Sequence, residues 1–208
     1  MRYAMFIDLD TCAGCGACVM ACKIQNGTPL DNYWCTIHTR EVGKYPNVEK
    51  RVMPYGCMHC AKAPCVELCP TGASFYSGTG AVLIDPDLCV GCKMCMSACP
   101  YHVRFFNENA PEDTPYFKGY GLTPFEAMHA ADHPRGVVEK CIQCEGRVAE
   151  GKEPACVATC ITKCRLFGDV DNPESEISKA IIKSGARVLF PEYGTEPGVY
   201  YAGKYFEE

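Results

Sequence analysis

The stretch "CVGCKMCMSACP", from Cys89 to Pro100, decides what kind of fold this chain adopts. Its four cysteines are separated by two, two and three residues, and a proline follows the last of them. A nearly identical phrase, "CAGCGACVMACK", runs from Cys12 to Lys23. Four thiols so close together indicate a site that binds several thiolates at once. The duplication indicates that the chain contains repeated units.

The composition is that of a globular protein. The chain has 208 residues, enough for one ordinary domain or two small ones, with 48% hydrophobic and 22% charged residues. The formal net charge of −5 argues against a nucleic-acid partner. The sequence contains no run of 18 apolar residues, so it predicts no membrane-spanning segment. The stretch "MRYAMFIDLD" lacks the features of a secretory signal. We therefore expect a cytoplasmic protein, or one exported only with a catalytic subunit that carries the signal.

Eighteen cysteines allow three interpretations: disulfides, zinc sites and iron–sulfur clusters. Disulfides suit small secreted chains, and cysteines two residues apart bridge poorly. Zinc sites usually combine two C-x2-C pairs, often with histidine, and do not explain runs of four cysteines. Iron–sulfur clusters explain those runs directly, because C-x2-C-x2-C-x3-C is the bacterial ferredoxin motif.

Sixteen of the cysteines fall into four groups along the chain. Group one is Cys12, Cys15, Cys18 and Cys22; group two is Cys57, Cys60, Cys65 and Cys69; group three is Cys89, Cys92, Cys95 and Cys99; group four is Cys141, Cys144, Cys156 and Cys160. In the ferredoxin motif three thiolates surround one [4Fe–4S] cube, and the fourth ligates a second cube. Groups should therefore work in pairs. Only groups two and three end in proline (Pro70, Pro100), which favours two different pairs.

Short elements surround these motifs. Strand-like stretches, "YAMFIDL" and "AVLIDP", precede groups one and three, and helical turns follow inside each motif. Gly14, Gly16 and Gly91 should adopt left-handed backbone, which lets backbone N–H groups approach the cluster sulfurs. The predicted fold class is α+β, with two ferredoxin-like two-cluster units related by a pseudo-twofold axis, rich in loops, short strands and short helices.

The ordered groups resemble the iron–sulfur beta subunit of the DMSO-reductase-type molybdopterin oxidoreductases. The phrases that carry the resemblance are "CMHCAKAPCVELCPTGA", "CVGCKMCMSACPY", "VEKCIQCEGRVAEGKEPACVATC" and the late "GTEPGVYY". The resemblance covers almost the whole chain. It implies that group one pairs with group four, and group two with group three.

The resemblance also implies the ligands of four clusters. Cluster 1 takes Cys12, Cys15, Cys18 and Cys160; cluster 2 takes Cys141, Cys144, Cys156 and Cys22; cluster 3 takes Cys57, Cys60, Cys65 and Cys99; cluster 4 takes Cys89, Cys92, Cys95 and Cys69. Some relatives carry Trp where this chain has Cys92, and there the cluster is [3Fe–4S]. We therefore expect four [4Fe–4S] clusters here.

The implied function is electron transfer without a catalytic site in this chain. Single electrons would pass between a large catalytic subunit with a molybdenum or tungsten bis-pterin and a membrane anchor or soluble redox partner. Clusters 1 and 2 would lie nearer the catalytic subunit. The alternatives are a freestanding polyferredoxin shuttle and, with far fewer clusters expected, an iron–sulfur sensor.

The remaining segments give weaker expectations. The predicted units are residues 1–50 plus 139–170 and residues 51–103, with an interface loop at 104–138 and a partner-binding extension at 171–208. A helix is expected in each of the last two segments, one capped by Thr123 and one starting at Asn172–Pro173 and ending at Gly185. Four residues beside the ligands are candidates for tuning cluster potentials, namely Lys93, Lys140, His59 and Arg104. Cys35 and Cys164 are left over and are interpreted as small buried hydrophobic residues.

Overall fold

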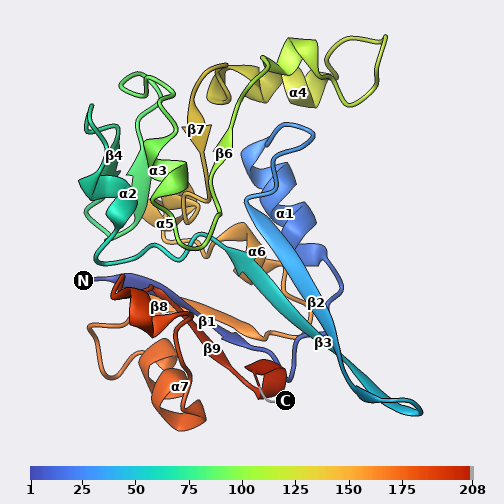
Figure 1. Ribbon diagram of the computed structural model, residues 1–208, viewed down its shortest axis with the longest axis vertical. Coiled ribbons are helices and arrows are strands. Elements are labelled where there is room, and N and C mark those ends of the chain that lie inside the picture. The colour runs from blue at the N-terminus through green and yellow to red at the C-terminus, as the bar shows by residue number, and fades with distance from the viewer. Residues whose placement is uncertain (207–208) are drawn as a thin grey trace.

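A computed structural model describes residues 1–206. Its largest sheet has three strands in the order β8-β1-β9. The central strand is β1 (Tyr3–Asp8), which pairs antiparallel with β8 (Arg165–Asp169) and parallel with β9 (Val199–Ala202). The sheet therefore joins segments from both ends of the chain (Figure 1). The predicted strand "YAMFIDL" is confirmed as β1.

Helix α7 (Glu176–Ser184) covers one face of this sheet. Side chains alternate along β1, so Ala4 and Phe6 pack against Ile177 of α7, while Met5 and Ile7 face the main core. Ile177 is 2% exposed, and burying such a side chain contributes roughly 1.5–3 kcal/mol.

The predicted start of α7 was wrong by three residues, although its end at Gly185 is confirmed. The Asn172 side chain accepts a hydrogen bond from the Glu174 N–H at 2.9 Å, which forms a turn ahead of the helix. Ser175 caps the helix instead, with Oγ accepting from the Ser178 N–H at 3.2 Å.

The last strand of the described chain packs inside the protein. Strand β9 completes the sheet, and Tyr201 on that strand is 1% exposed, with its hydroxyl donating to the Pro54 carbonyl at 3.1 Å. Short 3-10 turns flank this strand at η3 (Pro191–Tyr193) and η4 (Lys204–Phe206). Within the predicted extension at 171–208, strand β9 is thus part of the sheet layer, because long-range pairing with β1 gives it a partner within the chain.

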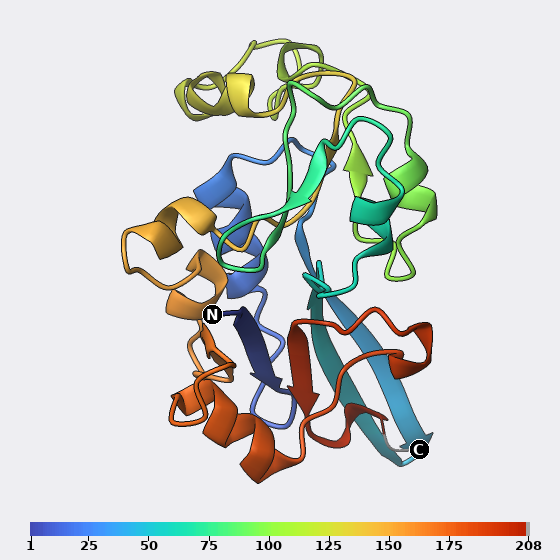
Figure 2. The same ribbon diagram turned by 90° about the vertical axis from the view of Figure 1, so that its left-hand side faces the viewer.

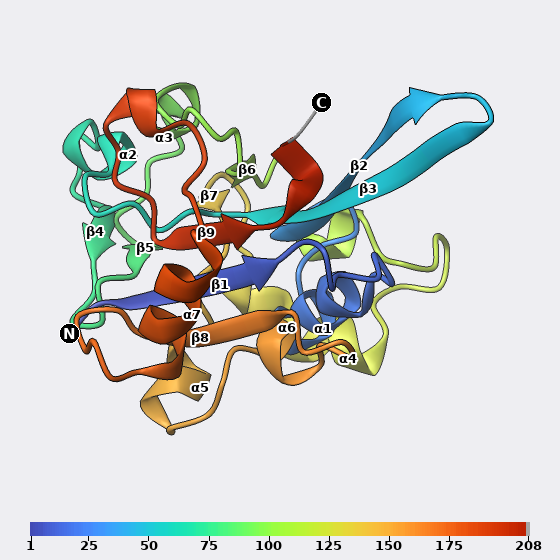
Figure 3. The same cartoon turned by 90° about the horizontal axis from the view of Figure 1, so that it is seen from below.

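Strands β2 (Cys35–Lys44) and β3 (Asn47–Gly56) form a long antiparallel hairpin. Figure 3 shows this hairpin extending away from the body of the molecule. The expected unit boundary between residues 50 and 51 falls inside β3, where Lys50 pairs with Glu41.

The cysteine groups lie on short elements at the two sides of the molecule. On one side are α1 (Ala17–Asn26), α5 (Glu145–Ala149) and α6 (Ala155–Ala158). On the other are α2 (Pro64–Glu67), α3 (Met94–Ser97) and the hairpin of β4 (Ser74–Tyr76) with β5 (Val82–Ile84). Figure 2 shows α5 and α6 opposite α2 and α3. Helix α1 packs against α6, and α2 against α3.

A short ladder of β6 (Phe105–Phe106) and β7 (Val138–Glu139) links the two sides. The chain between β6 and β7 contains three short helical elements, η1 (Pro111–Asp113), α4 (Pro124–His129) and η2 (Ala130–Asp132). The capping box predicted at Thr123 is confirmed: its Oγ1 accepts from the Glu126 N–H at 3.2 Å. This segment packs on the chain itself, since the Tyr116 hydroxyl donates to the Thr28 carbonyl at 2.8 Å.

Among residues 1–206, no helix combines the length and the apolar character that a membrane crossing requires.

Candidate metal centre

One backbone feature recurs in all four cysteine groups. The residue before the second cysteine has a positive φ in each group, which L-residues rarely adopt. These residues are Gly14 (64°), His59 (42°), Gly91 (64°) and Gln143 (55°). The left-handed turn bends each loop back on itself and brings its first cysteines together. The left-handed backbone expected at Gly14, Gly16 and Gly91 is confirmed, and two non-glycine residues adopt the same conformation at a steric cost.

A second left-handed position follows three of the groups. It stands three residues after the last cysteine, at Gly72, His102 and Lys163. Group one differs, because α1 continues through Cys22 to Asn26. The loops of groups two, three and four thus share both left-handed positions, and group one has only the first of them.

One cavity lies at the centre of the molecule. Six cysteines line it: Cys22, Cys141, Cys144 and Cys156, together with the leftover Cys35 and with Cys57 of group two. Burial and the charges of Cys156 and Cys144 together raise the pKa of Cys22 to about 12. The cavity therefore combines three cysteines of group four with the last cysteine of group one.

A second cavity lies near α3. It is lined by four cysteines: Cys69, Cys89, Cys92 and Cys95. The Ser74 N–H points at the Cys69 sulfur at 3.4 Å. Here three cysteines of group three meet the last cysteine of group two.

A third set gathers around Cys60. Burial, together with the charges of three further thiolates, raises the pKa of Cys60 to about 12. The three thiolates are Cys57, Cys65 and Cys99. Three cysteines of group two and the last one of group three are thus close enough to interact.

The fourth set includes the two leftover cysteines. A hydrogen bond with Cys164 lowers the pKa of Cys12 to about 6, and one with Cys35 lowers the pKa of Cys18 to about 6. The Cys160 and Cys164 sulfurs are 3.4 Å apart. Cys35 and Cys164 are buried, as expected, and sequence reasoning did not foresee that both lie beside group one. Cys15 is exposed, and no described hydrogen bond within residues 1–206 joins its thiol to the others.

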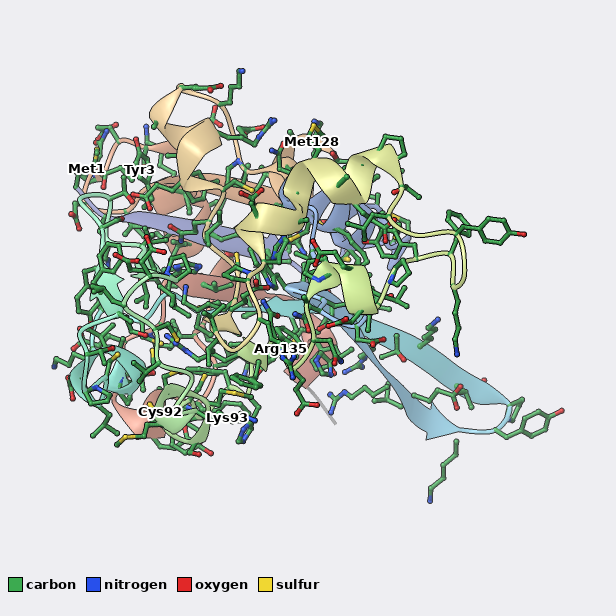
Figure 4. The ribbon with its side chains drawn as sticks, turned by 90° about the horizontal axis from the view of Figure 1, so that it is seen from above. Met1, Tyr3, Cys92, Lys93, Met128 and Arg135 are labelled. Carbon is green, nitrogen blue, oxygen red and sulfur yellow. The ribbon has the colours of Figure 1, made fainter. Side chains whose placement is uncertain are left out.

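Two cysteines reach the surface, Cys15 in one set and Cys92 in another. Figure 4 shows Cys92 and Lys93 together at the edge of the molecule. The other sixteen cysteines are buried or half-buried.

These sets fit iron–sulfur clusters better than single metal ions. Within residues 1–206, no three side chains of His, Cys, Asp or Glu converge as ligands of one ion would. Four thiolates placed around a cavity suit a cube whose four irons each take one thiolate. Buried donors also point to an absent acceptor: in the described chain, His59 Nε2, Arg104 Nη2 and Gln143 Nε2 have no hydrogen-bond partner. Cluster sulfides accept such hydrogen bonds.

His59 illustrates how the backbone prepares such a donor. The Val82 N–H donates to His59 Nδ1 at 3.1 Å, so in the neutral ring the proton sits on Nε2. Burial lowers the pKa of His59, which favours this neutral form. The ring lines the central cavity.

The four candidate tuning residues differ in exposure. His59, Arg104 and Lys140 are at most 5% exposed. The Lys93 side chain is 48% exposed and lies 4.0 Å from Glu108. Sequence reasoning missed Arg165, which is 5% exposed and lines the central cavity. One available signal was its spacing: Arg165 follows Cys160 by as many residues as Arg104 follows Cys99.

Comparison with known proteins gives the same picture. A family model described as a 4Fe-4S dicluster domain matches residues 48–114 and 118–170, and a 4Fe-4S binding domain matches residues 3–24. The iron–sulfur subunit of the arsenate respiratory reductase of a Shewanella species is 38% identical over 97% of this chain and 96% of its own length. The B subunit of the selenate reductase of Mesobacillus selenatarsenatis is 37% identical over 97% of this chain and 72% of its own length. An iron–sulfur subunit from Halobacterium salinarum, 39% identical over 96% of this chain and 78% of its own length, is named for dimethyl sulfoxide reductase.

This chain is an iron–sulfur subunit of the DMSO-reductase family. As such a subunit, it transfers electrons within an oxidoreductase complex and is not the catalytic chain. The B subunit of the sulfite dehydrogenase of Allochromatium vinosum, at 36% identity over 96% of this chain and 82% of its own length, shows that relatives also serve dehydrogenases.

Proposed function

We propose that this iron–sulfur subunit holds four [4Fe–4S] clusters and relays single electrons between a molybdenum or tungsten bis-pterin subunit and a second redox partner. The proposed ligands are the four sets predicted above, three cysteines of one group with the last cysteine of its partner group. The two pairs would form two ferredoxin-like units related by a pseudo-twofold axis, residues 1–50 with 139–170 and residues 51–103.

One observation carries this proposal. Two separate cavities are each lined by a complete predicted set, with Cys22 joining three cysteines of group four, and Cys69 joining three of group three. Cysteines so far apart in sequence meet in this way only if the groups interleave. The packing of α1 on α6 and of α2 on α3 supports the same pairing.

The chain's own residues would do three things for the bound groups. The thiolates ligate them, and the left-handed loops direct N–H groups at ligand sulfurs, as Gln143 does to Cys141 at 3.4 Å. Buried donors such as His59 Nε2 offer hydrogen bonds to the inorganic sulfides. When bound, the clusters supply one-electron redox chemistry.

The two exposed cysteines suggest where electrons enter and leave. Cys15 belongs to the proposed cluster 1 and Cys92 to the proposed cluster 4, which stand at opposite ends of the series. Each end carries exposed apolar side chains, Met20 and Ile161 near the first and Val90 and Met94 near the second. We assign the Cys15 end to the bis-pterin subunit and the Cys92 end to the membrane or soluble partner.

Anaerobic purification of the native assembly tests the proposed partner. We expect about one molybdenum or tungsten atom per chain and a large co-purifying subunit identified by mass spectrometry. Substitution of Ile161 by glutamate, at the Cys15 end, should release that subunit. The matched change of Val90 to glutamate, at the Cys92 end, should not. An iron-rich protein with no molybdenum, no tungsten and no large co-purifying subunit would instead indicate a freestanding ferredoxin.

A further inference from the structure

Four lysine or arginine side chains are buried in the described chain. Lys23 Nζ donates to the backbone carbonyls of Thr28, Pro29 and Leu30, whereas the other three cations lie among the cysteine sets. Arg165, Lys140 and Arg104 are 5%, 1% and 5% exposed. Within residues 1–206 none of them forms an ion pair with a carboxylate. A buried charge is unfavourable unless an opposite charge or a set of hydrogen bonds compensates it. The nearby anions are thiolates, so each cation's position relative to the cysteine sets decides its role.

Arg165 lies between the first two sets. It pairs with Ile7 across the β1–β8 ladder, and this register turns its side chain toward the main core. Its Nη1 donates to the Met5 sulfur at 3.3 Å and its Nη2 to the Cys35 sulfur at 3.6 Å. Burial opposes the charge, yet the thiolates of Cys156 and Cys18 raise the pKa of Arg165. Cys18 belongs to the proposed cluster 1 and Cys156 to cluster 2.

Lys140 lies between the second and third sets. Its Nζ donates to the carbonyls of Cys141, at 2.8 Å, and of Val82. The Val82 N–H in turn donates at 3.1 Å to Nδ1 of His59, which stands between Cys57 and Cys60 in the chain. Cys141 belongs to the proposed cluster 2 and Cys57 to cluster 3, and both line the central cavity.

Arg104 lies between the third and fourth sets. Its Nη1 donates to Ser74 Oγ at 3.1 Å, while Nη2 has no partner in the described chain. Burial opposes the charge, but the thiolates of Cys65 and Cys95 raise the pKa of Arg104. Cys65 belongs to the proposed cluster 3 and Cys95 to cluster 4.

The β6–β7 ladder makes this arrangement unusual. Phe105 pairs with Glu139, so Arg104 and Lys140 stand at the next opposed positions of the same antiparallel register. Like charges directly opposite each other are unfavourable. Two buried cations at such positions are stable only if anions lie beside them. Bound clusters with their thiolate ligands would supply that negative charge.

We propose that Arg165, Lys140 and Arg104 form a row of buried cations, one in each gap between successive clusters, and that each raises the reduction potentials of both neighbouring clusters. This inference rests on the proposed ligand sets. A positive charge stabilises the more negative reduced cluster, and at a buried place the effect is little screened by water or salt. Sharing each cation between two clusters would keep neighbouring potentials matched along the series.

A redox titration of the anaerobic complex, monitored by electron paramagnetic resonance, tests whether these three cations raise the cluster potentials. Each of Arg165→Gln, Lys140→Gln and Arg104→Gln should lower the reduction equilibrium constants of its two flanking clusters by tenfold or more, about 59 mV for a one-electron couple. The other two clusters should not shift. Arg165→Lys and Arg104→Lys keep the charge and should restore most of the wild-type potentials, which separates charge from packing.

Lys93→Gln is the matched control. Lys93 follows the proposed ligand Cys92 directly, but its side chain is half-exposed. The change in cluster potential caused by Lys93→Gln should therefore be several-fold smaller than that of the buried variants, and it should disappear at high salt. Three results would contradict the proposal. The potential of only one cluster could shift, the potentials of all four could shift equally, or the Lys variants could shift the potentials as much as the Gln variants do. Iron content separates this failure from that of the proposed function: a wild-type protein without four clusters refutes the ligand sets before any variant is compared.

Discussion

Removal of iron from the purified protein should abolish the cooperative fold of most of the chain. The main core includes cluster ligands among its buried members, such as Cys60, Cys65, Cys95 and Cys99. Without clusters these thiols have nothing to bind, and the left-handed loops at His59 and Gln143 keep their backbone cost. The buried cations Arg104 and Arg165 also lose their counter-charge. Binding of the metal groups should therefore be coupled to folding.

Circular dichroism of the chelated, reduced chain measures this effect. We expect loss of the cooperative thermal transition, and its return when iron and sulfide are added back anaerobically. Protein treated with the same reductant without chelator is the control. A native-like cooperative melt of the iron-free chain would contradict the expectation.

Substitution of one buried cysteine should remove a cluster, whereas substitution of its neighbour should not. Cys22 and Cys35 lie in the same small core cluster, with exposures of 7% and 8%. Only Cys22 belongs to a proposed ligand set. Cys22→Ala should lower iron from about 16 to about 12 per chain, because one cube loses a ligand. Cys35→Ala should keep the wild-type iron content, since it removes a small buried side chain and its hydrogen bonds with Cys18 and Arg165 but no proposed ligand.

The comparison between these two variants is informative because their packing costs are alike. Iron analysis and the cluster spectrum report ligation, while thermal melting reports packing. Equal iron loss in both variants would mean that Cys35 is a ligand, and unchanged iron in Cys22→Ala would refute the predicted pairing of groups one and four.

Local signals in the sequence predicted local structure well. The capping box of Thr123 and Glu126, the left-handed turns at Gly14 and Gly91, and the strand before group one all follow from neighbouring residues. The cysteine spacing alone indicated iron–sulfur chemistry. In each case the determining interaction spans only a few residues.

Features that depend on distant contacts were missed. The burial of Arg165 follows from its pairing with Ile7, and strand β9 is buried because it pairs with β1. No nearby residue signals the pairing of β9, and the one local signal for Arg165 is its spacing from Cys160. The start of α7 was missed for a local reason: Asn172 and Ser175 both suit a cap, and Asn172 forms the preceding turn instead.

Quantification of iron and acid-labile sulfide in the freshly purified anaerobic complex tests the central claim most directly. Four cubane clusters require about 16 iron and about 16 sulfide per copy of this chain, after subtraction of any cluster in the large subunit. The presence of Cys92 also predicts no oxidised [3Fe–4S] signal in the same sample. Iron near 12 per chain, or about half the expected amount, would contradict the four-cluster account.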